Sequence, residues 1–290
     1  MPEITGKTRL GCLLGSPVAH SISPQMYNYA FRKLDLDYVY LCFDTSKADF
    51  ASLVGRLKEM NVFGFNLTMP DKERIIPYLD ELTPAAKMIG AVNTVKNEDG
   101  RLIGHNTDGA GYFRSLRCTG YEASRAPMTL LGAGGAASSI AVQAALDGVP
   151  VLHIVNRRGR SWQQAQRLAE VICRETSCRA DVTDLADTEA VTGCIRESGL
   201  LTNATSVGMT PAEDACPLAD LSGFHEGLLV TDIIYHPQKT LLLKKAEEKG
   251  LSTLNGMYML LYQGEAAFRF WTGLQMPTEE IKERYFDGKL

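Results

Sequence analysis

The first hundred residues alternate short apolar runs with segments whose apolar residues recur at helical spacing. Runs at 10–14, 37–43 and 62–67 have the aromatic and β-branched content of strands. Between them, segments 24–34 and 50–60 place their apolar residues along one face of a helix. Strands that alternate with helices predict an α/β fold, in which helices cover a mostly parallel sheet.

The same alternation restarts after the polar stretch at 121–127. A strand is predicted at 128–131, a glycine turn at 132–135, a helix at 136–146 and a second strand at 151–155. We therefore expect a second α/β domain that begins near residue 113.

Later in the chain, apolar runs at 200–203 and 228–233 predict two further strands. Segment 256–273 is strongly apolar and has helical spacing. Periodicity alone leaves open which domain this last helix joins.

Composition narrows the class of protein. The chain has 290 residues, 45% hydrophobic and 22% charged, which is typical of a soluble globular protein with two domains. A formal net charge of −4 gives no support for nucleic-acid binding, which requires a clustered basic surface. No run of about 18 uninterrupted apolar residues occurs, and residues 1–9 lack the apolar core of a secretory signal. We expect a cytoplasmic protein with neither nucleic acid nor membrane as a partner.

The seven cysteines show no spacing that predicts a disulfide or a metal site. Cys173 and Cys178 are the closest pair, and a single C-x4-C is weak evidence for a metal. Buried or reduced thiols in a reducing compartment are expected, and no metal is predicted.

Residues 132–137, G-A-G-G-A-A, match the dinucleotide fingerprint G-x-G-x-x-A between a predicted strand and a predicted helix. Gly132 permits the tight turn, and Gly134 lets the backbone approach a pyrophosphate. Ala137 allows the helix to pack closely on the strand. An anion then lies at the helix N-terminus. A tight connection without a ligand is the alternative, but the surrounding βαβ pattern favours binding. The residues expected to hold the dinucleotide are Gly132, Ala133, Gly134, Gly135 and Ala136.

The end of the second strand of this unit predicts which dinucleotide is bound. An NAD-specific fold places a carboxylate there for the ribose hydroxyls. This chain has instead N-R-R-G-R, in which Asn156 is followed by Arg157, Arg158 and Arg160. Guanidinium groups are suited to a phosphate, and this favours NADP over NAD.

Six short motifs occur in order along nearly the whole chain. They are S-I-S-P at 21–24, G-F-N-L-T-M-P-D-K at 64–72, G-A-V-N-T at 90–94, G-H-N-T-D-G at 104–109, N-A-T-S-V-G-M at 203–209 and G-M-Y-M-L-L-Y-Q at 256–263. Together they resemble the motifs of the shikimate dehydrogenase family. The resemblance implies a substrate-binding catalytic domain at 1–112, joined by C-terminal helices at 256–290, and an NAD(P)-binding Rossmann domain at 113–255.

The same resemblance implies an NADP-dependent oxidoreductase, a monomer or a homodimer, that interconverts shikimate and 3-dehydroshikimate in chorismate and aromatic amino-acid biosynthesis. Lys72 is the proton acceptor that it implies, and Asp108 is its partner. A lysine is ordinarily protonated at neutral pH, so Lys72 must be tuned by its surroundings to act as a base. Stabilisation of a developing oxyanion is the other role open to it.

Neutral hydrogen-bonding side chains make up the substrate set that the resemblance implies, which suits a ligand with several hydroxyls and one carboxylate. They are Ser21, Ser23, Asn66, Thr68, Asn93, Tyr235 and Gln263. It also assigns to the cofactor Thr205, Ile233 and Gly256. His105 is expected to be a surface residue in its turn.

Three alternatives stay open. A quinate/shikimate dehydrogenase would use NAD or both cofactors, but that branch commonly carries an acidic residue where Gly159 stands. Ser23 and Thr68 favour shikimate, since quinate needs room for one more hydroxyl. An NADP-sensing module that is not an enzyme would have lost Lys72 or Asp108, and both are present. A Rossmann dehydrogenase for an open-chain acid has support only in the glycine turn.

Overall fold

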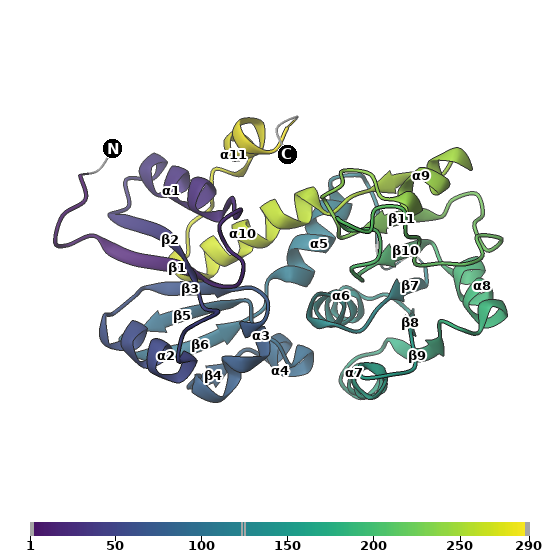
Figure 1. Ribbon diagram of the computed structural model, residues 1–290, viewed down its shortest axis with the longest axis horizontal. Helices are drawn as coiled ribbons and strands as arrows, with labels where there is room; N and C mark the ends of the chain where they lie inside the picture. Colours follow the sequence, from purple (N-terminus) through teal and green to yellow (C-terminus); the bar gives the residue numbers. More distant parts are fainter. Residues whose placement is uncertain (1–2, 123, 125, 288–290) are drawn as a thin grey trace. The chain divides into compact units, whose positions relative to one another are not determined.

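The computed structural model describes residues 3–122, 124 and 126–287, and the chain divides into two compact units (Figure 1). Unit 1 comprises Met1–Thr107 and Leu261–Leu290, and unit 2 comprises Asp108–Leu260. The predicted boundaries were 112/113 and 255/256. Residues 123 and 125 of the polar stretch at 121–127 lie outside the described residues.

Unit 1 is built on a six-stranded sheet of order β2-β1-β3-β5-β6-β4. Its strands are β1 (Arg9–Gly15), β2 (Tyr38–Asp44), β3 (Gly64–Leu67), β4 (Glu81–Leu82), β5 (Thr94–Glu98) and β6 (Arg101–His105). The pairs β1–β2, β1–β3 and β4–β6 are parallel, whereas β5 runs antiparallel to both β3 and β6. The sheet is therefore mixed, and its parallel part is the part that the sequence pattern predicts.

Helices cover both faces of this sheet (Figure 1). They are α1 (Ser23–Lys33), α2 (Phe50–Glu59), α3 (Asp71–Arg74), the 3-10 turn η1 (Ile76–Tyr78), α4 (Pro84–Ile89), α10 (Met257–Thr272) and α11 (Thr278–Tyr285). Helix α4 has clear local signals, because the Thr83 hydroxyl accepts a hydrogen bond from the Ala86 N–H, Pro84 occupies the first turn and Gly90 ends the helix at φ 70°. One core cluster joins apolar residues of α2 and α4 to β1 and β3.

Trp271 of α10 anchors the C-terminal segment to the sheet of unit 1. Its Nε1 donates a hydrogen bond to the Val95 carbonyl at 2.9 Å, and only 7% of the residue is exposed. Its ring lies 5.1 Å from that of Tyr27 in α1 and 5.7 Å from that of Phe63. The indole fills the space above Gly64, where an added Cβ would lie 2.5 Å from Nε1. The last helices therefore pack on a sheet that begins more than half a chain earlier.

Unit 2 has an all-parallel sheet of order β12-β11-β10-β7-β8-β9. Its strands are β7 (Met128–Leu131), β8 (Val151–Asn156), β9 (Arg179–Asp184), β10 (Leu200–Asn203), β11 (Leu229–Asp232) and β12 (Thr253–Leu254). The strand order reverses between β7 and β10, which is the doubly wound Rossmann-like arrangement. The predicted α/β class is confirmed in both units.

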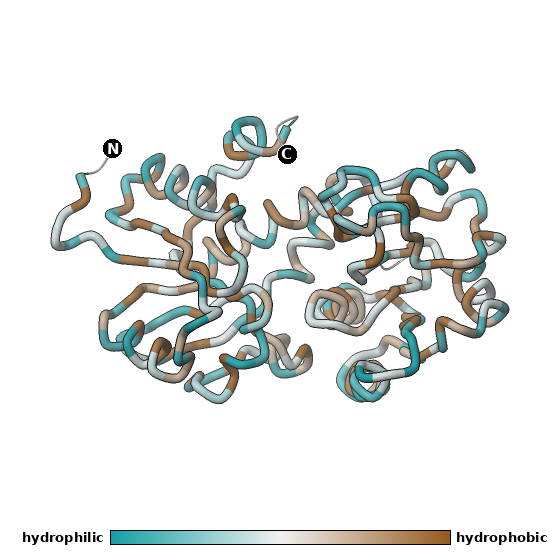
Figure 2. Tube along the Cα trace, viewed as in Figure 1, coloured by the Kyte–Doolittle hydropathy of each residue, from teal (hydrophilic) through white to brown (hydrophobic). Residues whose placement is uncertain are grey.

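The helices of unit 2 lie on both faces of its sheet. They are α5 (Asp108–Arg117), α6 (Gly135–Leu146), α7 (Trp162–Glu175), α8 (Thr188–Glu197) and α9 (Leu241–Glu248). The apolar residues of α8 and α9 form a core with β7, β8, β10 and β11, and Figure 2 shows hydrophobic residues along the strands. Strands β7, β10 and β11 are buried at every position, which explains their continuous apolar runs. In the described part of the chain, no helix has the length and apolar character that crossing a bilayer requires.

Replacing Trp271 by Phe tests the anchor. The change removes the hydrogen bond to the Val95 carbonyl and part of the packing. We therefore expect the free energy of unfolding to fall by about 2–4 kcal/mol. The measurement is a urea titration followed by circular dichroism. Trp162→Phe, at the half-buried start of α7, is the matched control and should cost less than about 1 kcal/mol. Equal losses in the two variants would contradict a special role for Trp271.

Candidate functional site

The predicted substrate residues of unit 1 gather where β1 and β3 end. The loops that follow these strands are joined, because the Thr68 N–H donates to the Leu14 carbonyl at 2.9 Å and the Ser16 N–H donates to the Met69 carbonyl at 3.0 Å. Ser21 and Ser23 lie in one turn before and at the start of α1, where the Ser23 N–H donates to the Ser21 hydroxyl at 3.3 Å. Parallel strands bring these loops to one edge of the sheet.

Asn66 is buried at the end of β3, with 6% of its surface exposed. Its amide nitrogen donates to the Asn93 carbonyl at 3.1 Å and to the Thr94 hydroxyl at 3.0 Å. Its amide oxygen accepts from the Tyr40 hydroxyl at 2.7 Å. A buried amide with partners on both ends has one orientation, so Asn66 is held rigidly.

Asn93 continues the same network. Its amide oxygen accepts from the Thr107 N–H at 2.9 Å, and its amide nitrogen donates to the Thr107 hydroxyl at 2.9 Å. The nitrogen also lies 3.5 Å from the Gln263 amide oxygen. The structure thus brings together Asn66, Asn93 and Gln263, which are far apart in the chain. Sequence reasoning missed Tyr40, whose hydroxyl fixes this group and which lies outside every recognised motif.

Lys72 lies in the short helix α3 and is half-buried. Its backbone carbonyl accepts from the Val92 N–H at 2.8 Å, which ties α3 to the segment that carries Asn93. The neighbouring Asp71 is fully buried and accepts hydrogen bonds from Thr45 at 2.5 Å and Arg74 at 2.7 Å. Asp71 is therefore a positioning residue for α3 that the sequence offered only as part of a motif.

Asp108 begins α5 in unit 2, and only 6% of it is exposed. The next residue packs α5 tightly on α6, because a Cβ on Gly109 would lie 2.3 Å from the Ser139 carbonyl oxygen. Tyr112, one turn further on, is hydrogen-bonded to Thr202 at 2.6 Å in β10. Asp108 thus starts a helix whose position on the Rossmann sheet is closely defined.

The glycine turn has the open space that a bound pyrophosphate needs. Gly132 adopts φ 104°, a conformation that favours glycine, and packs against the Ala204 backbone and the Thr205 side chain. A Cβ built on Gly134 or Gly135 would meet no heavy atom within 4 Å. Gly134 is also the N-cap of α6 and has no side chain to satisfy the free N–H groups there. An anion can therefore approach this helix end directly.

The arginines after β8 have a neighbour that the local sequence does not reveal. Arg158 donates from Nε to Asp184 of β9 at 2.7 Å, and its guanidinium lies 4.9 Å over the Trp162 ring. Backbone N–H donation from Ala186, followed by Arg158, lowers the pKa of Asp184. Sequence analysis found no carboxylate at the end of β8, and the register supplies one by pairing Asn156 with Asp184. Part of the positive charge of this loop is thus balanced by β9.

Arg157 and Arg160 are exposed on the same loop. Asn156 is 8% exposed, and its amide donates to the Ser161 hydroxyl at 3.0 Å, which shapes the turn. All the arginines predicted for the cofactor are therefore accessible from solvent, on a loop that begins at a fixed residue.

Thr205 lies in a loop fixed by a second buried network. The Asn203 amide oxygen accepts from the Thr205 N–H at 3.1 Å and from its hydroxyl at 2.7 Å. The Asn203 amide nitrogen donates to Asp232 at 3.0 Å, and Thr240 donates to the same carboxylate at 2.9 Å. Burial raises the pKa of Asp232 to about 6, against the opposing effect of these donors. Asp232 is a positioning residue that the sequence did not identify, and Asn203 is one that the sequence offered only as part of a motif.

Ile233 and Gly256 are in direct backbone contact. A Cβ on Gly256 would lie 1.9 Å from the Ile233 carbonyl oxygen, and the Gly256 N–H donates to the Ile234 carbonyl at 3.1 Å. Tyr235 follows in the same loop, where burial raises the pKa of its hydroxyl. The structure brings Ile233 and Gly256 together. Tyr235 lies two residues after Ile233 in the same loop.

His105 corrects one expectation. It was predicted to be a surface residue in its turn, but it ends β6 and is partly buried. Its Nδ1 lies 2.9 Å from the Thr83 hydroxyl, and its ring packs 4.9 Å from that of Phe270. Desolvation lowers the pKa of His105. The histidine is a packing residue because the turn that was read from the sequence is the end of a strand.

Comparison with known families gives two matches. Residues 13–95 match the shikimate dehydrogenase substrate-binding domain, and residues 256–284 match the shikimate 5'-dehydrogenase C-terminal domain.

Similar proteins extend over nearly the whole chain. A shikimate dehydrogenase (NADP(+)) of Listeria innocua is 47% identical over 284 residues, 98% of each chain. The solved structure of a Listeria monocytogenes shikimate 5-dehydrogenase in complex with shikimate and NAD is 46% identical and superposes with a TM-score of 0.94 over 99% of each chain. A quinate dehydrogenase of Corynebacterium glutamicum in complex with NAD is 29% identical, with a TM-score of 0.85 over 97% of this chain and 99% of that one.

Gly256→Ala tests the close contact between Gly256 and the Ile233 carbonyl. The new methyl group would displace the Ile233 carbonyl, so we expect the Kd for NADPH to rise at least about tenfold, equivalent to about 1.4 kcal/mol. Fluorescence titration of bound NADPH measures it. Gly193→Ala is the control, because a Cβ there meets nothing within 4 Å and helix α8 favours alanine. A folded Gly256→Ala protein with unchanged Kd would remove this residue from the cofactor site.

Proposed function

The chain belongs to the shikimate dehydrogenase family, and we propose that it interconverts shikimate and 3-dehydroshikimate with NADP as the hydride carrier. The full-length similarity to a shikimate dehydrogenase (NADP(+)) carries this proposal. The arrangement of the motif residues also supports it. Asn66 and Asn93 belong to a rigid hydrogen-bonded network, and the glycine turn has open space around Gly134 and Gly135. The pathway that follows is the biosynthesis of chorismate and aromatic amino acids.

We assign substrate binding and catalysis to the domain at 1–112 with its C-terminal helices at 256–290, and cofactor binding to the domain at 113–255. The described units support this division, since the glycine turn and the arginine loop lie in one unit and the amide network lies in the other. The all-parallel doubly wound sheet of unit 2 is the architecture that binds dinucleotides where its strand order reverses.

The reaction requires a hydride acceptor and a group that handles one proton. NADP, when bound, accepts the hydride from the alcohol carbon of shikimate. Lys72 and Asp108 are the residues that we propose for the hydroxyl proton. The Lys72 amine takes the proton or stabilises the developing oxyanion, and the Asp108 carboxylate orients the amine and accepts from the same hydroxyl. Two observations support the assignment: the buried Asp71 carboxylate pairs with Arg74 within α3, the helix that carries Lys72, and Asp108 is buried at the start of α5.

The substrate set supplies recognition without net charge. Asn66, Asn93 and Gln263 share one hydrogen-bonded group, and we propose that the ring hydroxyls of the substrate bind against it. Ser21 and Ser23 carry hydroxyl donors that suit the substrate carboxylate, and Thr68 and Tyr235 complete the set.

The cofactor residues fit NADP by their chemistry. Gly132 to Ala136 leave room for the pyrophosphate at the N-terminus of α6, with Thr205, Ile233 and Gly256 on the adjoining loops. Arg157, Arg158 and Arg160 offer guanidinium donors for the 2′-phosphate. Asp184 neutralises part of this charge, and we infer that it leaves NAD as a weaker second cofactor.

Lys72→Ala is the first test of the mechanism. Loss of the amine should lower kcat about 10²- to 10⁴-fold, because a positioned proton-transfer group is worth that much. NADPH binding should be unchanged, since Lys72 is assigned to the substrate. Lys87→Ala, an exposed lysine at the end of α4, is the control. Full turnover in Lys72→Ala would remove this residue from the mechanism.

Kinetics with two acids and two cofactors tests the assignment of substrate. We expect kcat/KM to be highest for shikimate with NADP and lower for quinate or for NAD. Steady-state assays of NADPH and NADH absorbance give all four values. A higher value for quinate, or for NAD, would make the protein a quinate/shikimate dehydrogenase. An NADP-binding protein with no turnover on either acid would instead be a sensing module.

A further inference from the structure

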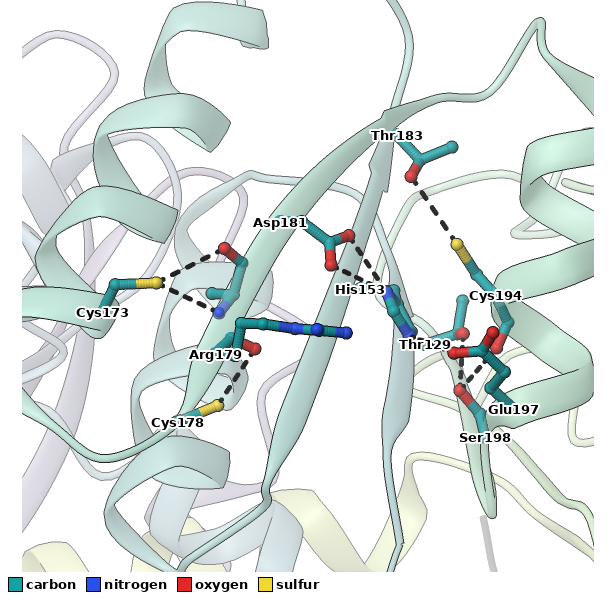
Figure 3. A network of polar contacts seen from close by, with 11 residues as sticks. Thr129, His153, Cys173, Cys178, Arg179, Asp181, Thr183, Cys194, Glu197 and Ser198 are labelled. Carbon is teal, nitrogen blue, oxygen red and sulfur yellow. Dashed lines mark hydrogen bonds and ion pairs between the residues drawn. The ribbon is translucent and has the colours of Figure 1, made fainter.

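A second cluster of reactive side chains lies in unit 2, apart from the residues assigned to the cofactor. His153 of β8, Asp181 of β9 and Cys194 of α8 each offer one ligand atom, and these atoms lie within 4.8 Å of one another. Figure 3 shows the side chains of Asp181 and Cys194 pointing toward the imidazole from two different elements. The cluster combines one nitrogen, one oxygen and one sulfur donor.

The strand register forms half of this cluster. His153 pairs directly with Asp181 across β8 and β9, so both side chains stand on the same face of the sheet. Nδ1 of His153 lies 3.0 Å and 3.1 Å from the two carboxylate oxygens of Asp181. Helix α8 covers this face and adds Cys194, whose sulfur lies 3.6 Å from the Thr183 hydroxyl. Three elements therefore meet at one histidine.

The imidazole is almost fully buried, and among the described residues only its Nδ1 has a hydrogen-bond partner, in Asp181. His153 is 5% exposed, and its Nε2 is buried without a hydrogen-bond partner. The nearest acid to Nε2 is Glu197, at 3.8 Å. Nδ1 is the nitrogen that faces Asp181, so an ion shared with this carboxylate would bind the ring there.

The donor set indicates which cation would bind. Magnesium and calcium prefer oxygen ligands alone, whereas imidazole and thiolate together with one carboxylate suit zinc. Zinc–ligand bonds of about 2.0–2.3 Å require the cluster to contract by about 1 Å. Asp181 can make this movement, because its side chain is 43% exposed at the rim. The same exposure gives the ion a path from solvent.

We propose that His153, Asp181 and Cys194 bind a zinc ion on the α8 face of the unit 2 sheet, with the fourth position open to water. The ion joins β8, β9 and α8, and its role is structural. This assignment does not rest on the proposed dehydrogenase function. Sequence motifs gave no sign of the site, because its ligands are separated by 28 and 13 positions and only the strand register unites them.

Cobalt substitution tests the sulfur ligand directly. The full-length protein is stripped of metal with a chelator, desalted and titrated with Co²⁺, whose bonds to thiolate produce an intense near-ultraviolet absorption. We expect one Co²⁺ per chain, displaced by Zn²⁺, and one Zn²⁺ per chain by elemental analysis. Addition of Zn²⁺ should also raise the melting temperature, because the ion binds the folded state.

Cys194→Ser should abolish the thiolate band and weaken binding at least about tenfold. Cys173→Ser is the matched control, since this exposed thiol lies near β9 but contacts the Ala180 backbone instead of His153. Asp181→Asn provides a second ligand variant at a partly exposed position, and its binding should weaken too. NADPH binding and circular dichroism verify that each variant is folded. Absence of stoichiometric metal, or equal binding in the Cys194 and Cys173 variants, would overturn the proposal.

Discussion

The requirement that buried polar groups find partners determines where this protein can carry chemistry. At the end of β3, the Asn66 amide donates to the Asn93 backbone carbonyl, and the Asn93 amide is paired with Thr107. At the end of β10, the Asn203 amide is paired with Asp232 and the 205 backbone. Each network closes a loop at the carboxyl edge of a sheet without help from a ligand. The loops are therefore shaped before binding, which lowers the entropy that binding costs.

The two networks differ in charge. The amide group of unit 1 is neutral, and the amide N–H groups of Asn66 and Asn93 are paired within it. The network of unit 2 contains Asp232, whose charged form burial disfavours. Because its pKa rises only to about 6, this carboxyl is largely ionised at neutral pH, and hydrogen bonds from Asn203, Thr240 and the Ile234 N–H stabilise its charge.

Much of the fold could be predicted from the sequence. What the sequence did not show was mainly which strands pair with one another and where the half-exposed strands lie. Buried parallel strands such as β7 and β10 are continuous apolar runs, and their predicted bounds are confirmed. The hairpin of β5 and β6 was missed, although Asp99 and Gly100 form its turn with positive φ and are a known turn pair. Strand β9 was missed because its R-A-D-V-T-D sequence is partly exposed throughout. Half-exposed edge strands carry a weak hydrophobic signal.

Residues of the candidate site could be predicted where a short motif contains them. They could not be predicted where two residues far apart in the chain act together. The motifs located Asn66, Asn93 and Gln263, and the coordinates add that these side chains meet. The pairing of Arg158 with Asp184 and the cluster at His153 depend on register between neighbouring strands. A short motif cannot encode such partners, because their spacing along the chain is set by the intervening helix.

Unit 1 is discontinuous, and this has a consequence for synthesis on the ribosome. Residues 108–260 are complete before Trp271 has been made, so the Rossmann unit can fold while the first sheet still lacks the indole that covers Gly64. Until Trp271 has been translated, the face of the sheet at Gly64 stays uncovered by the indole. The domain that starts first is thus the one that finishes last.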